Sequence, residues 1–161
     1  AILDASLVCS ASLPCPAEMG ASIHINGTGS SVIDTVFVCR STGRFPRRWL
    51  ASDAAGVAEI VLRDIEMLAD GGLKATKGDI RCISCGHLTR LAIWNLRQTW
   101  DSGLAVMERM DIVRQWYSGF GGLGAVLTAL EEAFSQAGNS QKWESSAVLQ
   151  ETYEPEDEIS F

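Results

Sequence analysis

The sequence lacks the features that would assign it at once to a well-known class. No apolar run approaches the ~20 residues that a membrane-spanning helix needs, and no signal peptide opens the chain. We therefore expect a cytoplasmic protein without a membrane partner. The five cysteines, an odd number without a secretory context, argue against a disulfide framework. Neither G-x-S-x-G nor H-E-x-x-H occurs, so the sequence offers no signature of a serine or zinc hydrolase.

The composition is that of one domain with an unevenly distributed charge. The chain has 161 residues, 47% of them hydrophobic, which is enough for a real core. Its net charge of −7 is the wrong sign for a protein that binds DNA over its whole surface. Much of this excess lies in residues 138–161, which we expect to be an acidic, disordered tail.

The start of the chain suggests a missing segment. There is no initiating Met, and residues 1–5 resemble the last turn of an amphipathic helix. We infer a fragment whose true N-terminus lies upstream, with deliberate trimming as the alternative.

The chain is organised around residues 14–40. A polar, glycine-punctuated loop leads into an apolar and β-branched run at 32–39, which predicts a strand covered on both faces. Residues 7–13 predict an earlier strand, ended by Pro14 and Pro16. Asp34 would be a carboxylate within the second strand, so it needs partners or a place at the sheet end. Polar loops held by buried strands often carry binding groups.

The same stretch carries a recognisable pattern: P-x-x-A/S-E-M, a loop of small polar residues, and then S-x-x-D-x-x-x-V-C-R. The chain resembles the C-terminal part of DUF1156-type adenine-specific DNA methyltransferases over about its first forty residues, and more loosely to about Arg97. The matching residues are Pro16, Ala17, Glu18, Met19, Ser31, Asp34, Val38, Cys39 and Arg40.

The resemblance implies a Rossmann-like α/β sheet whose terminal strands lie within residues 1–50. It also implies S-adenosylmethionine as methyl donor for the full-length enzyme, with DNA and the upstream part of the same polypeptide as partners. The family motif [DN]-P-P-[YFW], which hydrogen-bonds the amino nitrogen of a flipped adenine, is missing here. We therefore expect this chain alone to be inactive and to bind no cofactor.

Two groups of residues are candidates for contacting DNA. By the resemblance, the loop beside the pocket would contact the flipped base or its strand through Glu18, Ser22, His24 and Asn26. An acid–base pair of Glu18 and His24, or ordinary loop hydrogen bonds, are the alternatives. The second group would contact phosphates and consists of Arg40, Arg44, Arg47 and Arg48. Solvated loop charges are its alternative.

Residues 51–137 predict a helical extension. Ser52 or Asp53 is expected to cap a helix that runs to about Asp70. A second helix is expected to begin at an Asp79 cap, with a break at Gly86 as one outcome. Its core-facing stripe comprises Ile80, Ile83, His87, Leu91 and Trp94. Further helices are expected at about 104–117 and 125–136.

Two short motifs have ordinary and functional interpretations. Residues 119–124 match G-x-G-x-x-G. A dinucleotide or S-adenosylmethionine site with this motif needs a strand before it, whereas we expect a helix before residue 119. The motif is therefore better explained as a glycine hinge between two helices. Cys82 and Cys85 form C-x-x-C near His87 without the second pair that structural zinc needs, so we expect no metal. The alternative to the methyltransferase fragment is a small non-enzymatic α+β interaction module that uses residues 104–136 and the tail.

Overall fold

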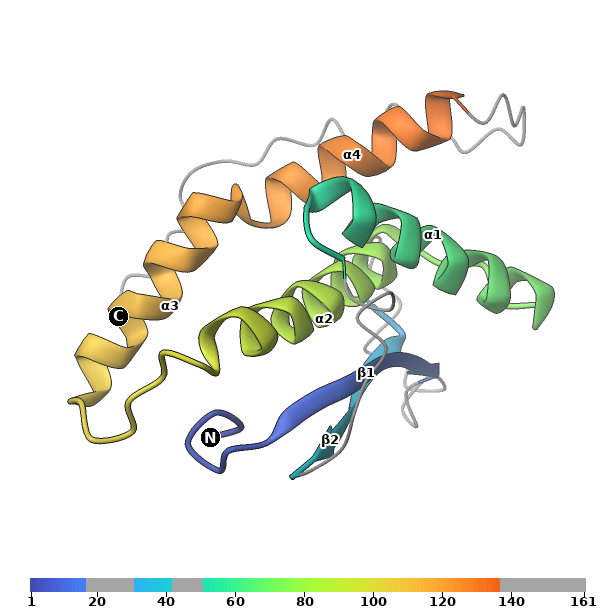
Figure 1. Cartoon of the computed structure of the whole chain (residues 1–161). Helices are drawn as coiled ribbons and strands as arrows, with labels where there is room; N and C mark the ends of the chain where they lie inside the picture. Colours follow the sequence, from blue (N-terminus) through green and yellow to red (C-terminus); the bar gives the residue numbers. More distant parts are fainter. Residues whose placement is uncertain (17–30, 42–50, 137–161) are drawn as a thin grey trace.

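The computed structural model describes residues 1–16, 31–41 and 51–136. These residues form an α+β structure in three layers (Figure 1). The strands pair with each other and lie on one side of the second helix, and the first and fourth helices pack on its other side. In chain order the elements are β1 (Val8–Pro16), β2 (Ile33–Arg40), α1 (Ala54–Asp70), α2 (Lys77–Leu96), α3 (Val106–Phe120) and α4 (Gly122–Gln136).

The two predicted strands form an antiparallel pair. Their register places Val8 opposite Arg40 and Pro16 opposite Ile33, with an irregularity between Cys9 and Ala11. β1 runs through both of its prolines, although the sequence predicted an end at residue 13. Proline has no N–H to donate, and it is tolerated in an edge strand where the missing donor would face away from the partner.

The prediction that residues 32–39 are covered on both faces is wrong. Ile33 is buried, but Asp34 next to it is exposed, and Val36 retains 45% of its surface in the described structure. Leu13, which lies opposite Val36 in the register, also retains 45%. The reason is that α2 covers one face of the two-stranded sheet, and no described element covers the other.

The helix α2 lies close against the sheet at Gly86. A Cβ atom there would lie 2.5 Å from Ser12 Oγ and 2.8 Å from Thr35 Cγ2, so no side chain fits. The helix continues unbroken through this glycine because a small residue is what the close contact requires. Further along α2, the indole N–H of Trp94 donates to the Cys9 carbonyl at 2.8 Å.

The core lies between α1, α2 and α4. Asp53 caps α1 as predicted, accepting from the Gly56 N–H at 2.8 Å. The α1 residues Val57, Val61, Ile65 and Leu68 are buried, and Ile83 of α2 and the α4 residues Val126 and Leu130 complete the same cluster. The predicted cap of α2 is wrong by three residues, because Thr76 is the N-cap and Asp79 lies in the first turn.

The glycine-rich motif joins two helices. Gly121 ends α3 with φ of +88°, and Gly122 follows with φ of +60°, conformations that residues with a Cβ rarely adopt. The Tyr117 ring occupies the space where a side chain on Gly122 would lie. The hinge interpretation is confirmed, since the element before the motif is a helix and not a strand.

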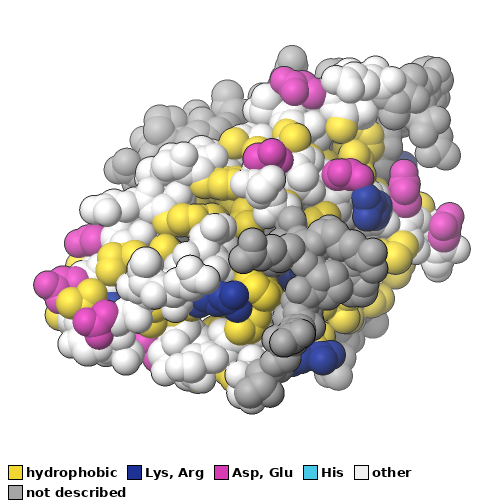
Figure 2. All heavy atoms as spheres, in the orientation of Figure 1, with side chains coloured by type: hydrophobic (Ala, Val, Ile, Leu, Met, Phe, Trp, Pro, Cys, Tyr) yellow, Lys and Arg dark blue, Asp and Glu magenta, His cyan; other side chains and the backbone are white. Residues whose placement is uncertain are grey.

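The helix α3 has no fully buried residue. It begins two residues later than predicted and ends at Phe120, whose ring stacks on Trp116 at 5.4 Å. Val106 and Met107 retain more than half of their surface. At the α3 end of the molecule, Figure 2 shows hydrophobic and acidic side chains next to each other on the surface.

Candidate functional site

Most of the predicted contact residues lie outside the described part of the chain. This holds for Glu18, Ser22, His24 and Asn26, and for Arg44, Arg47 and Arg48 of the basic cluster. Arg40 is the one member that is placed. It is exposed at the end of β2, opposite Val8. For the candidate loop between β1 and β2, the described residues are those at its two ends.

Both ends of that loop are fixed beside each other. The pairing of Pro16 with Ile33 joins the last described residue before the loop to the first residue of β2. After the loop, the Ser31 hydroxyl and the Val32 N–H donate to Asp79 Oδ1 at 2.9 and 2.8 Å. The other oxygen of Asp79 accepts from the N–H and hydroxyl of Thr76 at 2.7 and 2.8 Å. One carboxylate thus ties the loop end to the start of α2.

The electrostatics of Asp79 indicate a structural role. Its side chain is fully buried, which by itself would raise the pKa. Hydrogen bonds from Thr76, Ser31 and Val32 outweigh the burial and hold the pKa of Asp79 below its ordinary value. The carboxylate remains ionised at neutral pH with four donors around it, so it has no free lone pair for proton transfer. The signal in the sequence was Thr76-x-x-Asp79, a variant of the capping box.

A second buried carboxylate pairs with His87. Its Nε2 lies 2.7 Å from Asp64 Oδ2, and both side chains are buried between α1 and α2. Among the residues that the structure describes, the other ring nitrogen, Nδ1, has no hydrogen-bond partner, and neither has the buried Ser84 Oγ one turn earlier on α2. The sequence placed His87 on the core stripe but did not identify its partner. That signal was an acidic residue at position 64 within the apolar stripe of α1.

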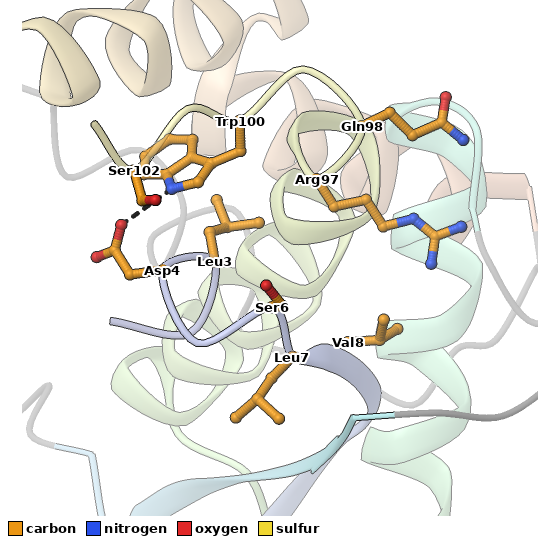
Figure 3. Close-up of a pocket in the computed structure, with 9 residues that line it drawn as sticks. All are labelled: Leu3, Asp4, Ser6, Leu7, Val8, Arg97, Gln98, Trp100 and Ser102. Carbon is orange, nitrogen blue, oxygen red and sulfur yellow. Dashed lines mark hydrogen bonds between the residues drawn. The ribbon is translucent and has the colours of Figure 1, made fainter. Parts of the chain in front are cut away.

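A surface pocket lies where the N-terminal turn meets the end of α2 (Figure 3). Its volume is about 320 Å³, and its polar lining includes Ser6, Arg97 and Gln98. The Arg97 guanidinium lies 4.0 Å from the centre of the Trp94 ring, which holds its charge beside the pocket. Sequence reasoning missed this pocket because its walls are distant in the chain and carry no motif.

The acidic group of this pocket is already engaged. Asp4 accepts from the Trp100 indole N–H at 3.0 Å, drawn in Figure 3, and pairs with Arg109. Hydrogen bonds from the amino terminus and Trp100, assisted by Arg109, lower the pKa of Asp4 to about 2. Asp4 is therefore ionised at neutral pH and is not a proton donor.

The C-x-x-C cysteines do not converge on a common site. Cys82 Sγ donates to the Ile33 carbonyl at 3.3 Å, against the sheet, whereas Cys85 is exposed. Within residues 1–16, 31–41 and 51–136, no three metal-ligating side chains lie together. None of the described helices is long and apolar enough to cross a membrane.

Comparison of the chain with protein-family models, with curated proteins and with solved structures finds no match.

Proposed function

We propose that this chain supplies the terminal strands and a helical extension of an adenine-specific, S-adenosylmethionine-dependent DNA methyltransferase. The catalytic and donor-binding groups would come from the upstream part of the polypeptide. The residue pattern of 16–40 supports this proposal, and so does the small size of the sheet, which has two strands in the described part of the chain.

The observation that carries the proposal is that one face of β1 and β2 is covered by none of the described elements. Two-stranded sheets are marginally stable in water, and this one is covered on one face by α2. On its other face the cross-strand pair of Leu13 and Val36 remains about half exposed. Apolar side chains on an uncovered sheet face are typical of a surface that packs against further structure.

The candidate loop also fits a role in contacting DNA. Its ends are held beside each other by the Pro16–Ile33 pairing and by the contacts of Ser31 with Asp79. Polar loops positioned by rigid elements are common sites of recognition. In the proposal, Glu18, Ser22, His24 and Asn26 contact the flipped adenine or its strand, and the four arginines from Arg40 to Arg48 contact phosphates.

The test extends the reading frame upstream of Ala1 and compares the longer polypeptide with this chain. We expect transfer of labelled methyl groups from S-adenosylmethionine to adenine by the longer polypeptide and none by the chain alone. Leu13→Lys in the longer polypeptide should greatly reduce transfer, because a charge on the packed face opposes docking. Met67→Lys, at an exposed position on α1, is the matched control and should leave transfer unchanged.

Two outcomes would contradict the proposal. One is an upstream frame without [DN]-P-P-[YFW] and without transfer. The other is methyl transfer by the isolated chain above a no-protein control.

A non-enzymatic interaction module is the second candidate, and the exposed apolar side chains of α3 favour it. Val106, Met107, Met110 and Tyr117 all lie on this helix and are exposed. Cooperative unfolding of the isolated chain at a high melting temperature would favour the module. A low melting temperature without a cooperative transition would favour the incomplete enzyme.

A further inference from the structure

Two of the five cysteines are opposite one another in the strand pair. Cys9 of β1 and Cys39 of β2 are register partners, whereas Cys15 lies opposite Asp34. Directly opposed residues of antiparallel strands send their side chains to the same face, with Cα atoms about 4.5–5.5 Å apart. A disulfide needs Cα atoms at about 4.4–6.8 Å. The register therefore brings this pair within bonding range with small local adjustment.

The backbone beside the pair can provide that adjustment. The regular pairing is interrupted between Cys9 and Ala11, so Ser10 has no opposite residue. Such an irregularity bends the strand and increases its local twist. The Cys9 thiol is hydrogen-bonded to the Ala11 carbonyl at 3.3 Å across the same irregularity.

The two thiols differ in their access to solvent. Cys9 is fully buried, and Cys39 is partly exposed. Burial, with a further contribution from the neighbouring Cys39 thiol, raises the pKa of Cys9 to about 11. An oxidant in solution therefore reaches Cys39 first, and Cys9 is held beside it as a neutral thiol.

We infer that Cys9 and Cys39 are an oxidisable pair that peroxide converts into a cross-strand disulfide. In the first step the Cys39 sulfur attacks hydrogen peroxide, the O–O bond breaks, and a sulfenic acid and water form. In the second step the Cys9 sulfur attacks the sulfenic sulfur, the S–S bond replaces the S–O bond, and the Cys9 proton leaves with hydroxide as water. Two thiols and one peroxide thus give one disulfide and two waters.

The disulfide would close the end of the strand pair that lies opposite the candidate loop. At this end the Cys9 carbonyl also accepts the Trp94 indole N–H, and Arg40 follows Cys39 directly. Oxidation would thus fix β1, β2 and the contact with α2 as one unit. The inference does not depend on the proposed function.

The experiment treats the reduced full chain with hydrogen peroxide, alkylates the remaining thiols under denaturing conditions, and determines intact and peptide masses. We expect five alkylated cysteines before oxidation and three afterwards, with one linked peptide containing Cys9 and Cys39. The melting temperature should rise by roughly 10 °C, because the bond closes a long loop in the unfolded chain.

Variants separate this pair from other thiol chemistry. Cys39→Ser should abolish the linked peptide and the rise in melting temperature, and its partly exposed position makes it the variant that retains the fold. Cys15→Ser, on β1 with Cys9 and partly exposed like Cys39, is the matched control and should still form the linkage. Five alkylated cysteines after oxidation, a linkage between other positions, or irreversible oxidation of Cys39 without linkage would each overturn the inference.

Discussion

The carboxylate of Asp79 provides the sharpest test of the architecture. Asp79→Asn keeps the shape of the side chain but replaces one acceptor oxygen with an NH₂ group. In the structure, one oxygen faces the Val32 N–H and the other faces the Thr76 N–H. Whichever way the new amide is turned, its NH₂ group faces a backbone donor, and that donor loses its acceptor.

The expected cost follows from these contacts. An unsatisfied buried donor costs about 1–3 kcal/mol. The remaining hydrogen bonds lose the strength that the negative charge gave them, for about a further 1 kcal/mol. The free energy of unfolding should therefore fall by about 2–4 kcal/mol, or roughly 10 °C in melting temperature for a chain of this size.

The pH dependence provides an independent check. The pKa of Asp79 is lower in the folded protein than in the unfolded chain, so its stabilisation is fully present above the unfolded value, near 4. It is lost as the pH falls through the folded pKa. The difference in unfolding free energy between wild type and Asp79→Asn should therefore be constant from pH 7 to about pH 5 and shrink below that.

Urea unfolding followed by circular dichroism measures both quantities. Asp70→Asn, an exposed carboxylate at the end of α1, is the control and should change the unfolding free energy by less than about 0.5 kcal/mol. If Asp79→Asn matched this control, or if its effect did not change down to pH 3, the assignment of Asp79 as the tie between loop and helix would be refuted.

Three further predictions, the first with a matched control substitution, test the packing. Gly86→Ala should destabilise the fold by about 1–3 kcal/mol in urea unfolding, because its Cβ would overlap Ser12, whereas Gly124→Ala, with open space around it, should be neutral or stabilising. Asp64→Ala should cost about 2–4 kcal/mol in the same assay, since both ring nitrogens of its partner would then be buried and unpaired. Leu13→Thr should change the isolated chain by less than about 1 kcal/mol, because the Leu13 side chain remains half exposed; a larger loss would mean that this face is covered.

Local patterns in the sequence predicted the elements well. The existence of the two strands, the Asp53 cap and the end of α1, and the glycine hinge are all confirmed. Each depends on residues close together in the chain, such as an apolar stripe, a capping side chain or a pair of glycines. By contrast, glycine at position 86 of α2 is explained by its contact with the sheet. Helix propensity depends on neighbouring residues in the chain and could not predict this contact.

The errors arose where distant segments meet. Asp79 was predicted to cap α2, but its side chain also holds Ser31 and Val32, nearly fifty residues earlier. The apolar run of β2 predicted burial on both faces, but such a run does not specify what covers it. The partner of His87 and the walls of the pocket were missed for the same reason, because they join residues far apart in the chain. The loop residues named as DNA contacts stay a prediction.

The prolines of β1 make the two borders of the sheet unequal. Pro14 and Pro16 pair with Thr35 and Ile33 in the register. Because proline has no backbone N–H, two hydrogen-bond donors are missing on the edge of β1 that faces away from β2. A third strand that approached there would find an interrupted row of donors over the last part of β1. β2 has no proline, so each of its eight residues keeps its backbone N–H. Any added strand would therefore be selected by side, and uncontrolled edge-to-edge association would be discouraged along that part of β1.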